Sequence, residues 1–178
     1  FGSTALTIPS NHPERSRGIK PGIVEGLIIE RINMDLTSFE RGLGYHFKDE
    51  RLLFQALTHT TFAYESQQEN FSDNQRLEFL GDSVLTMVVA GYLYKKYPEY
   101  SEGELTRRRA LLVNRDNLTK KAKELNLSQY LLLGKGEEKL GGRENSTNLS
   151  CALEAIIGAI YLDGGFKQAY KFIMQIVM

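Results

Sequence analysis

The most informative segment of the chain reads Asn74-Gln75-Arg76-Leu77-Glu78-Phe79-Leu80-Gly81-Asp82-Ser83-Val84-Leu85. Its periodicity predicts a helix on which Glu78 and Asp82, four residues apart, project their carboxylates from one face. Two like charges held beside apolar residues repel each other, and a cation between them relieves that repulsion. Oxygen ligands favour a hard cation such as Mg²⁺. The opposite face carries Leu77, Val84, Leu85 and Val88.

A second apolar run, Leu149–Gly165, contains another carboxylate, Glu154. A lone Glu among apolar residues needs a partner. Gly81 in the first run costs on the order of 1 kcal/mol relative to Ala inside a helix, which predicts a close backbone approach at that point. The alternative is that the acidic pair only marks a solvated helix face. The apolar stripe around Glu154 comprises Leu149, Ala152, Ile156, Ile157 and Ile160.

The segment Asn74–Leu85 resembles the signature of the ribonuclease III family, endonucleases that cut double-stranded RNA. The resemblance covers residues 36–178, and it implies an all-α ribonuclease III endonuclease-domain fold that forms a homodimer. Residues 1–35 lie outside it and read as an N-terminal arm with a short amphipathic helix around Ile23–Ile32. The other matching segments, in family order and spacing, are Phe39–Glu65, Ser101–Leu105, Leu133–Glu138 and Glu154–Gly165.

Carried over residue by residue, the resemblance implies a metal site formed by Glu78, Asp82, Cys151 and Glu154. Glu78, Asp82 and Glu154 are its implied catalytic residues, and Mg²⁺ is the implied cofactor, with Mn²⁺ as a substitute. The family has Asp where this chain has Cys151. A thiol is a soft ligand with a reference pKa near 8.5, so it replaces neither the charge nor the hardness of a carboxylate.

Further site residues are implied by the same resemblance. Gln75, Glu102 and His59 are assigned to the outer shell of the metal site or to the RNA-facing surface. The alternative for His59 is a hydrogen-bonded structural role. Phe79 and Leu80 resemble the residues through which the family dimerises, and ordinary core packing is the alternative. Contacts with RNA phosphates are assigned to Arg107, Arg108 and Arg109, with Lys120, Lys121 and Lys123 as further candidates, against the alternative of solvated helix faces.

The implied function is metal-dependent hydrolysis of phosphodiester bonds in double-stranded RNA, as part of RNA processing. Water in the place of the missing ligand would let a three-carboxylate site remain active, because Mg²⁺ keeps several waters. The alternative is a catalytically inactive relative that binds structured RNA or serves as a subunit of a ribonucleoprotein assembly. Cys151 and the unassigned arm favour that alternative, whereas Glu78, Asp82 and Glu154 oppose it.

Composition sets the remaining bounds. The chain has 178 residues, 42% of them hydrophobic, and a net charge of zero, which predicts one domain and gives no sign of nucleic-acid binding by itself. The single Cys excludes an internal disulfide and is consistent with an intracellular location, in the cytoplasm or an organelle. No segment reads as long and apolar enough to span a membrane.

Periodicity predicts helices and no strand of convincing length. Asp73 or Asn74 is expected to cap the helix that contains the signature segment. Gly134-Lys135-Gly136 lacks the residues of a phosphate-binding loop and is expected to be an ordinary loop, and Gly141-Gly142 a turn. The predicted helices are Asp49–Leu57, Asn74–Tyr97, Glu102–Asn114, Arg115–Leu125, Leu149–Gly164 and Phe166–Val177.

Overall fold

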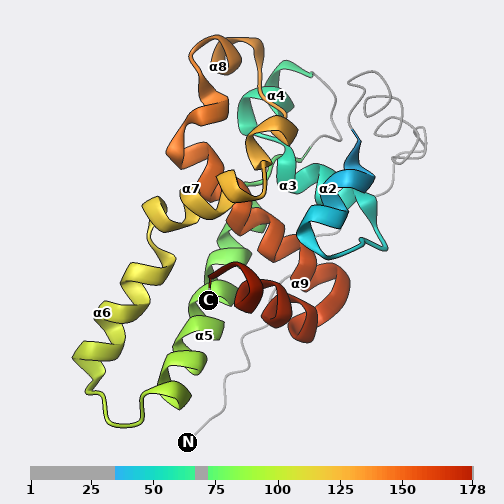
Figure 1. Ribbon diagram of the computed structural model, residues 1–178. Helices are drawn as coiled ribbons and strands as arrows, with labels where there is room; N and C mark the ends of the chain where they lie inside the picture. The colour runs from blue at the N-terminus through green and yellow to red at the C-terminus, as the bar shows by residue number, and fades with distance from the viewer. Residues whose placement is uncertain (1–34, 67–71, 178) are drawn as a thin grey trace, which may run out of the picture.

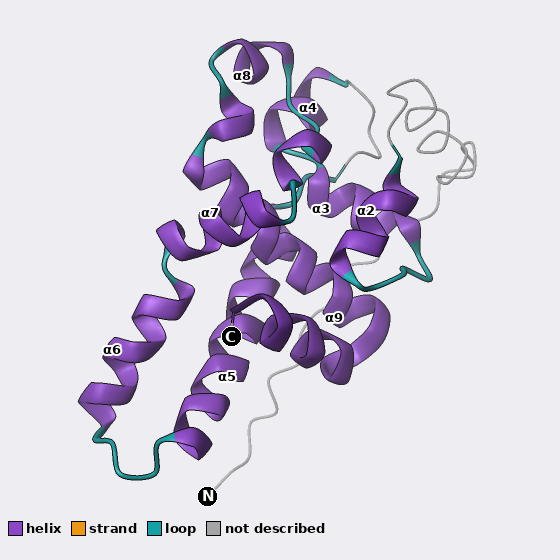
Figure 2. Cartoon of the chain, in the orientation of Figure 1, coloured by secondary structure: helices purple, strands orange, loops and turns teal. Residues whose placement is uncertain are grey.

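A computed structural model describes residues 35–66 and 72–177 of the chain, so the expected arm and its helix around Ile23–Ile32 lie outside the described residues. The described part is all-α, as predicted (Figures 1 and 2). Within it there is no strand, only one parallel bridge between Thr58 and Leu132. The helices are α2 (Leu36–Leu43), α3 (Glu50–Leu57), α4 (Thr60–Glu65), α5 (Gln75–Lys96), α6 (Glu102–Val113), α7 (Arg115–Glu124), η1 (Leu127–Tyr130), α8 (Lys135–Lys139), η2 (Gly142–Glu144) and α9 (Ser146–Val177).

Helices α3, α5, α6 and α7 match their predicted bounds to within one residue at each end. Helix α9 begins three residues before the predicted start, at Ser146. It contains a break at Gly165, whose φ of 76° and ψ of 178° are not helical. That break separates the two predicted helices, and it reverses the chain because Gly adopts a positive φ without steric cost.

Two short helices depart from the sequence predictions. The segment after Gly134 was expected to be a loop, and this is wrong: Gly134 is the N-cap of α8 (Lys135–Lys139). A helix this short lacks the periodic apolar face on which prediction relies. Gly141 does adopt the left-handed conformation of a turn, with a φ of 79°, and Gly142 opens η2. Helix α4 was not predicted, because its six residues include none that is buried.

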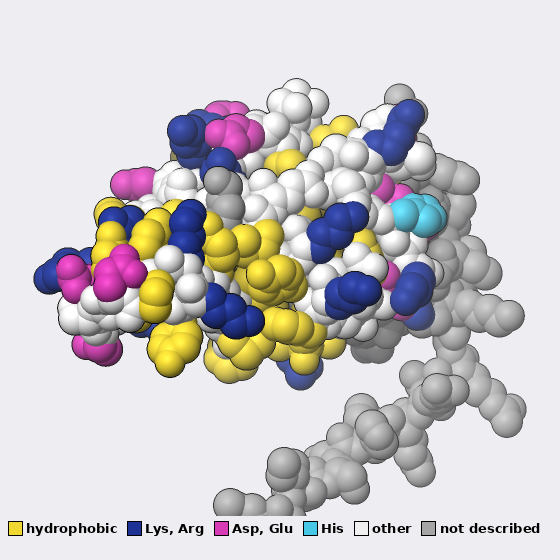
Figure 3. Space-filling model, turned by 60° about the horizontal axis from the view of Figure 1, so that its bottom comes forward, with side chains coloured by type: hydrophobic (Ala, Val, Ile, Leu, Met, Phe, Trp, Pro, Cys, Tyr) yellow, Lys and Arg dark blue, Asp and Glu magenta, His cyan; other side chains and the backbone are white. Residues whose placement is uncertain are grey.

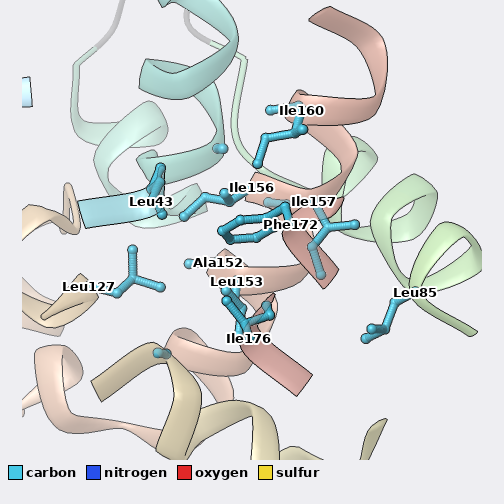
Figure 4. Close-up of a cluster of buried hydrophobic side chains, with 14 of the residues drawn as sticks. Leu43, Leu85, Leu127, Ala152, Leu153, Ile156, Ile157, Ile160, Phe172 and Ile176 are labelled. Carbon is cyan, nitrogen blue, oxygen red and sulfur yellow. The ribbon is translucent and has the colours of Figure 1, made fainter. Parts of the chain in front are cut away.

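The core forms where α9 packs against α5, α7 and α3. Residues Leu149–Ile160 supply eight of its buried apolar side chains, and Phe172 and Ile176 fold back onto them after the Gly165 break. Figure 4 shows Phe172 and Ile176 lying beside Ile156 and Leu153. Full burial of each such side chain contributes roughly 1.5–3 kcal/mol before conformational entropy is counted.

Two glycines allow α5 and α9 to cross with their backbones in contact. A Cβ atom added to Gly81 would overlap the carbonyl oxygen of Glu154 and lie 2.6 Å from its carbonyl carbon. A Cβ added to Gly158 would overlap the carbonyl oxygen of Leu77 and lie 3.1 Å from its carbonyl carbon. The close backbone approach predicted at Gly81 is therefore confirmed, and its partner is the helix that carries Glu154.

Asp163 fixes the loop between α2 and α3 to α9, just before the break. Its carboxylate accepts hydrogen bonds from the Tyr45 hydroxyl at 2.5 Å, the Lys48 amide at 3.0 Å and the Asp49 amide at 2.9 Å. Burial and the nearby Asp163 raise the pKa of Tyr45. The sequence pattern around Asp163 does not predict this role, because the loop that Asp163 binds is more than 110 residues away in the chain.

Helices α5 and α9 correct the expectation that no segment is long and apolar enough to span a membrane. Both pass that test by length and composition, with mean hydropathies of 1.2 and 1.4 over their most apolar 18 residues. Core helices pass it as well, and the apolar faces of these two are buried against each other.

Replacing Gly81 with Ala should destabilise the protein by roughly 1–3 kcal/mol, because the new methyl group would force α5 and α9 apart. Gly91 is the matched control: it lies in the same helix with nothing within 4 Å of an added Cβ. Gly91→Ala should be neutral or stabilise by up to about 1 kcal/mol. Urea unfolding of the two variants measures the difference, and equal stabilities would contradict the close crossing.

Candidate metal centre

The crossing of α5 and α9 brings three potential ligands together. The ligand atoms of Glu78 on α5 and of Cys151 and Glu154 on α9 all lie within 4.8 Å of one another, and each residue is partly buried. Cys151 and Glu154 are three positions apart, so they share a face of α9. Asp82 is exposed and does not belong to this close group. Of the four predicted ligands, the structure brings these three together and places Asp82 beside them.

The cluster is electrostatically strained. Burial, followed by the negative charges of Asp82 and Glu78, raises the pKa of Glu154 from 4.5 to about 7. Asp82 therefore acts on Glu154 through its charge even though it stands outside the close group. A carboxyl group with such a pKa is partly protonated at neutral pH, and a bound cation would favour its ionised form.

Cys151 takes part in the cluster as a neutral thiol. Burial raises its pKa to about 12, and a hydrogen bond to Glu78 acts in the same direction. A neutral sulfur that donates to a carboxylate is a poor ligand for Mg²⁺, which prefers hard oxygen donors. The carboxylates of the cluster fit a magnesium ion, and the thiol does not.

The first residues of the signature segment fasten α5 to α3. The buried Asn74 donates its amide to the Thr58 carbonyl at 2.9 Å, and its side chain reaches the Ala56 carbonyl at 3.5 Å. Its side chain makes no cap hydrogen bond, whereas Asp73 accepts from the Gln75 amide at 3.2 Å. Asn74 therefore occupies the N-cap position, and the hydrogen bond from the first turn is accepted by Asp73. The tethering role of Asn74, one turn before Glu78, was missed because nothing in a local pattern reveals a partner on another helix.

The residues assigned to the outer shell have separate surroundings. His59 is the N-cap of α4: its Nδ1 lies 2.8 Å from the Thr61 hydroxyl and 3.3 Å from the Thr61 amide. Glu102 is exposed in the first turn of α6 and accepts from the Thr106 hydroxyl at 2.9 Å. Gln75 is exposed at the start of α5. The alternative role of His59, a hydrogen-bonded structural residue, explains its observed contacts.

The three arginines occupy successive positions of α6, about 100° apart around the helix, so they do not share one face. The Arg108 guanidinium lies 4.7 Å from the Tyr97 ring centre and 4.8 Å from that of Tyr100. It also donates to the Tyr100 hydroxyl at 2.9 Å. These contacts tie α6 to the loop after α5, and both Arg107 and Arg108 are exposed. Among the candidate lysines, Lys121 pairs with Glu124 and Lys123 with Glu144.

A groove lined by both apolar and polar residues includes Phe79 and Leu80 of α5. Phe79 is 78% exposed, so core packing does not explain it, whereas Leu80 is partly buried and packs against the core. Both line a groove of about 710 Å³. Leu162 from α9 also lines it and is 54% exposed. The remaining lining residues are Gln55, Ser72, Gln75, Arg76 and Leu77.

Carboxylates that converge from two crossing helices of an all-α domain are typical of a metal-binding protein. Comparison with known proteins identifies the family. A family described as Ribonuclease-III-like matches residues 49–178. Ribonuclease 3 of Treponema denticola is 50% identical over 144 residues, which cover 80% of this chain and 58% of that protein. Ribonuclease 3 of Bacillus cereus is 48% identical over 139 residues, 78% of this chain and 57% of that protein. The chain belongs to the ribonuclease III family.

Solved structures agree with that assignment. The nuclease domain of ribonuclease III from Campylobacter jejuni is 43% identical with a TM-score of 0.75, over 80% of this chain and 96% of that one. Dicer from Pichia stipitis is 27% identical with a TM-score of 0.53, over 74% of this chain and 54% of that one. The predicted family and fold are confirmed. The chain spans less than two thirds of the length of the curated relatives.

The raised pKa of Glu154 predicts a pH-dependent stability in the absence of metal. Between the ordinary pKa of 4.5 and about 7, the folded protein holds a proton that the unfolded chain has lost, so stability falls as pH rises through that window. Glu154→Gln removes this loss. From pH 5 to 8 in a chelator, wild type should lose on the order of 1 kcal/mol relative to the variant, after allowance for solvent screening of a half-buried group.

Urea unfolding at intervals across that pH range tests this expectation. Glu50→Gln is the control, because Glu50 is exposed in the first turn of α3. Its curve should run parallel to that of wild type. If the Glu154→Gln curve is also parallel to wild type, the carboxyl group does not hold a proton in the folded state.

Proposed function

We propose that this chain is an endoribonuclease domain that hydrolyses phosphodiester bonds in double-stranded RNA. The observation that carries the proposal is the convergence of Glu78 and Glu154 from two crossing helices, with Asp82 close enough to perturb Glu154. The ribonuclease 3 proteins of Treponema denticola and Bacillus cereus, each about half identical to this chain, support it. Their name, ribonuclease, supports a reaction on RNA, and their bacterial origin supports an intracellular, cytoplasmic location.

The proposed cofactor is a divalent cation, Mg²⁺ or Mn²⁺, held by Glu78, Asp82 and Glu154. When bound, such an ion lowers the pKa of a coordinated water and stabilises charge at the phosphate. The residues of this chain supply position: the α5–α9 crossing fixes Glu78 against Glu154, and the tether at Asn74 fixes the start of α5. Partial burial strengthens the attraction of these carboxylates for a cation.

The proposed substrate is recognised by shape, because the grooves of double-stranded RNA present phosphates and 2′-hydroxyls rather than readable base edges. Arg107 is the best placed of the three arginines to contact phosphate, because Arg109 is only partly exposed and the guanidinium of Arg108, although exposed, is held by two tyrosines. Gln75 and Glu102, both exposed, are proposed to face the RNA or the outer shell of the metal site. Arg109 is a further candidate for contact with RNA phosphates. His59 is a further candidate for the outer shell of the metal site or the RNA-facing surface.

We propose that the domain works as a homodimer formed through Phe79 and the groove beside it. An exposed aromatic side chain next to a groove that contains three leucines suits a two-fold interface, in which each Phe79 enters the groove of the other copy. Leu80 and Leu162 supply apolar surface to that groove. The Campylobacter jejuni domain was described with a region involved in dimer formation, which supports the proposal. Hydrophobic side chains also gather on one face of the molecule (Figure 3).

The proposed activity predicts cleavage of a long RNA duplex in Mg²⁺ or Mn²⁺. Glu154→Gln should reduce the rate at least about 100-fold, because it removes a charged ligand. Cys151→Asp should raise the rate, because it supplies a hard ligand. Gel analysis of duplex cleavage measures these rates, with Glu50→Gln as a control that should match wild type. Cleavage unaffected by Glu154→Gln would overturn the proposal.

The proposed interface predicts that Phe79→Asp converts the dimer to a monomer, because a buried unpaired charge opposes association. Leu140 offers a matched control, since it is an exposed apolar residue at 86% exposure on another surface. Leu140→Asp should remain dimeric. Light scattering coupled to size-exclusion chromatography measures both masses, and circular dichroism checks that each variant is folded. A dimeric Phe79→Asp variant would exclude this interface.

A further inference from the structure

Cys151 is the one residue of the predicted metal centre that is a poor ligand for Mg²⁺. Its sulfur belongs to the group of ligand atoms within 4.8 Å of one another, together with carboxylate oxygens of Glu78 and Glu154. One sulfur and two carboxylates form a ligand set that Zn²⁺ accepts and Mg²⁺ does not. Cys151 therefore changes which ion suits the centre, and it does not prevent the centre from binding an ion.

The geometry of the cluster suits a single small ion. With Zn–S and Zn–O distances of about 2.3 and 2.1 Å, tetrahedral ligand atoms lie roughly 3.4–3.6 Å apart. The limit of 4.8 Å in the metal-free cluster therefore requires only a modest contraction. Two of the ligands share a face of α9, and Glu78 faces them from α5 across the glycine crossing. Rotation of the long Glu side chains closes the remaining distance without moving either helix.

The charge of the cluster favours a divalent ion that also accepts sulfur. Glu78 and Glu154 place two carboxyl groups within the cluster, Asp82 adds a third one turn along α5, and negative charges this close repel one another. A divalent ion reverses that repulsion. Affinity for a given set of N, O and S ligands is higher for Zn²⁺ than for Mn²⁺, and thiolate ligands increase that preference.

We propose that Glu78, Cys151 and Glu154 bind one Zn²⁺ ion, and that this ion excludes the ion needed for cleavage. The thiol releases its proton to solvent when its sulfur binds the metal, and water takes the fourth position. Zinc is then an inhibitor of the nuclease that acts at the metal centre itself. The binding part of the proposal stands on the cluster alone, whereas the inhibition rests on the proposed function.

Cd²⁺ provides a direct test of binding, because a cadmium–thiolate bond absorbs in the ultraviolet and Cys151 is the only cysteine of the chain. Titration of the metal-free protein in thiol-free buffer should produce this band with one ion per chain, and Zn²⁺ should abolish it by competition. Cys151→Ser should lack the band. Glu154→Gln should weaken binding by at least about 10-fold. Absence of the band in wild type, or no effect of Glu154→Gln, would overturn the proposal.

A cleavage assay at fixed Mg²⁺ tests the inhibition. Zn²⁺ should inhibit wild type at concentrations at least about 10-fold lower than those that inhibit Cys151→Asp, because the variant has lost the thiolate ligand. Equal inhibition of the two proteins would refute the regulatory role. If neither protein cleaves RNA while the cadmium band is present, the proposed function fails and the binding proposal stands. If both cleave and the band is absent, only the zinc proposal fails.

Discussion

The contact between the backbones of α5 and α9 is the constraint on which the rest of the structure depends. Gly81 and Gly158 remove the side chains that would hold the two helices apart, and the atom that Gly81 faces is the carbonyl oxygen of Glu154. Glu78 and Asp82 flank Gly81 in sequence. The interaction that closes the core is therefore also the one that sets the distance between the carboxylates of the two helices. A residue with a Cβ at Gly81 would change both at once.

In this arrangement, the hydrophobic packing of α9 places a carboxyl group where its negative charge is unfavourable. The apolar stripe of α9 is buried, and it carries Glu154 to a half-buried position beside Glu78 and Asp82, where its pKa rises to about 7. Cys151 eases the conflict in the metal-free state, because a neutral thiol adds no charge and donates a hydrogen bond to Glu78. An aspartate at the same position would add a fourth negative group. Compared with an aspartate, Cys151 is a less suitable ligand for Mg²⁺ but makes the metal-free cluster less repulsive.

Sequence patterns predicted the features that are local or periodic. The long helices, the break at Gly165 and the close approach at Gly81 all leave a signal in residue spacing or in an unusual glycine. The resemblance to ribonuclease III supplied the set Glu78, Asp82, Cys151 and Glu154, whose two halves no spacing rule joins across about 70 residues, and the structure brings Glu78, Cys151 and Glu154 of that set into one close group. What failed depends on partners in other elements: the Asn74 contacts with Thr58 and Ala56 and the Asp163 contacts with the α2–α3 loop. The Arg108 contacts with Tyr97 and Tyr100 cross only a short loop, and a charge pattern does not reveal them. The expectation that no segment is long and apolar enough to span a membrane failed, because buried core helices can be as apolar as membrane-spanning ones.

The neighbouring positions of Glu78 and Phe79 connect the metal centre to the proposed interface. Successive residues point about 100° apart on a helix, so Glu78 faces α9 while Phe79 is 78% exposed beside the groove. Both side chains start from the segment of α5 that Asn74 fastens to α3. If two copies join through Phe79 about a two-fold axis, the same short segment fixes each metal centre relative to the axis. The distance between the two centres would then be set by a rigid helix rather than by a loop.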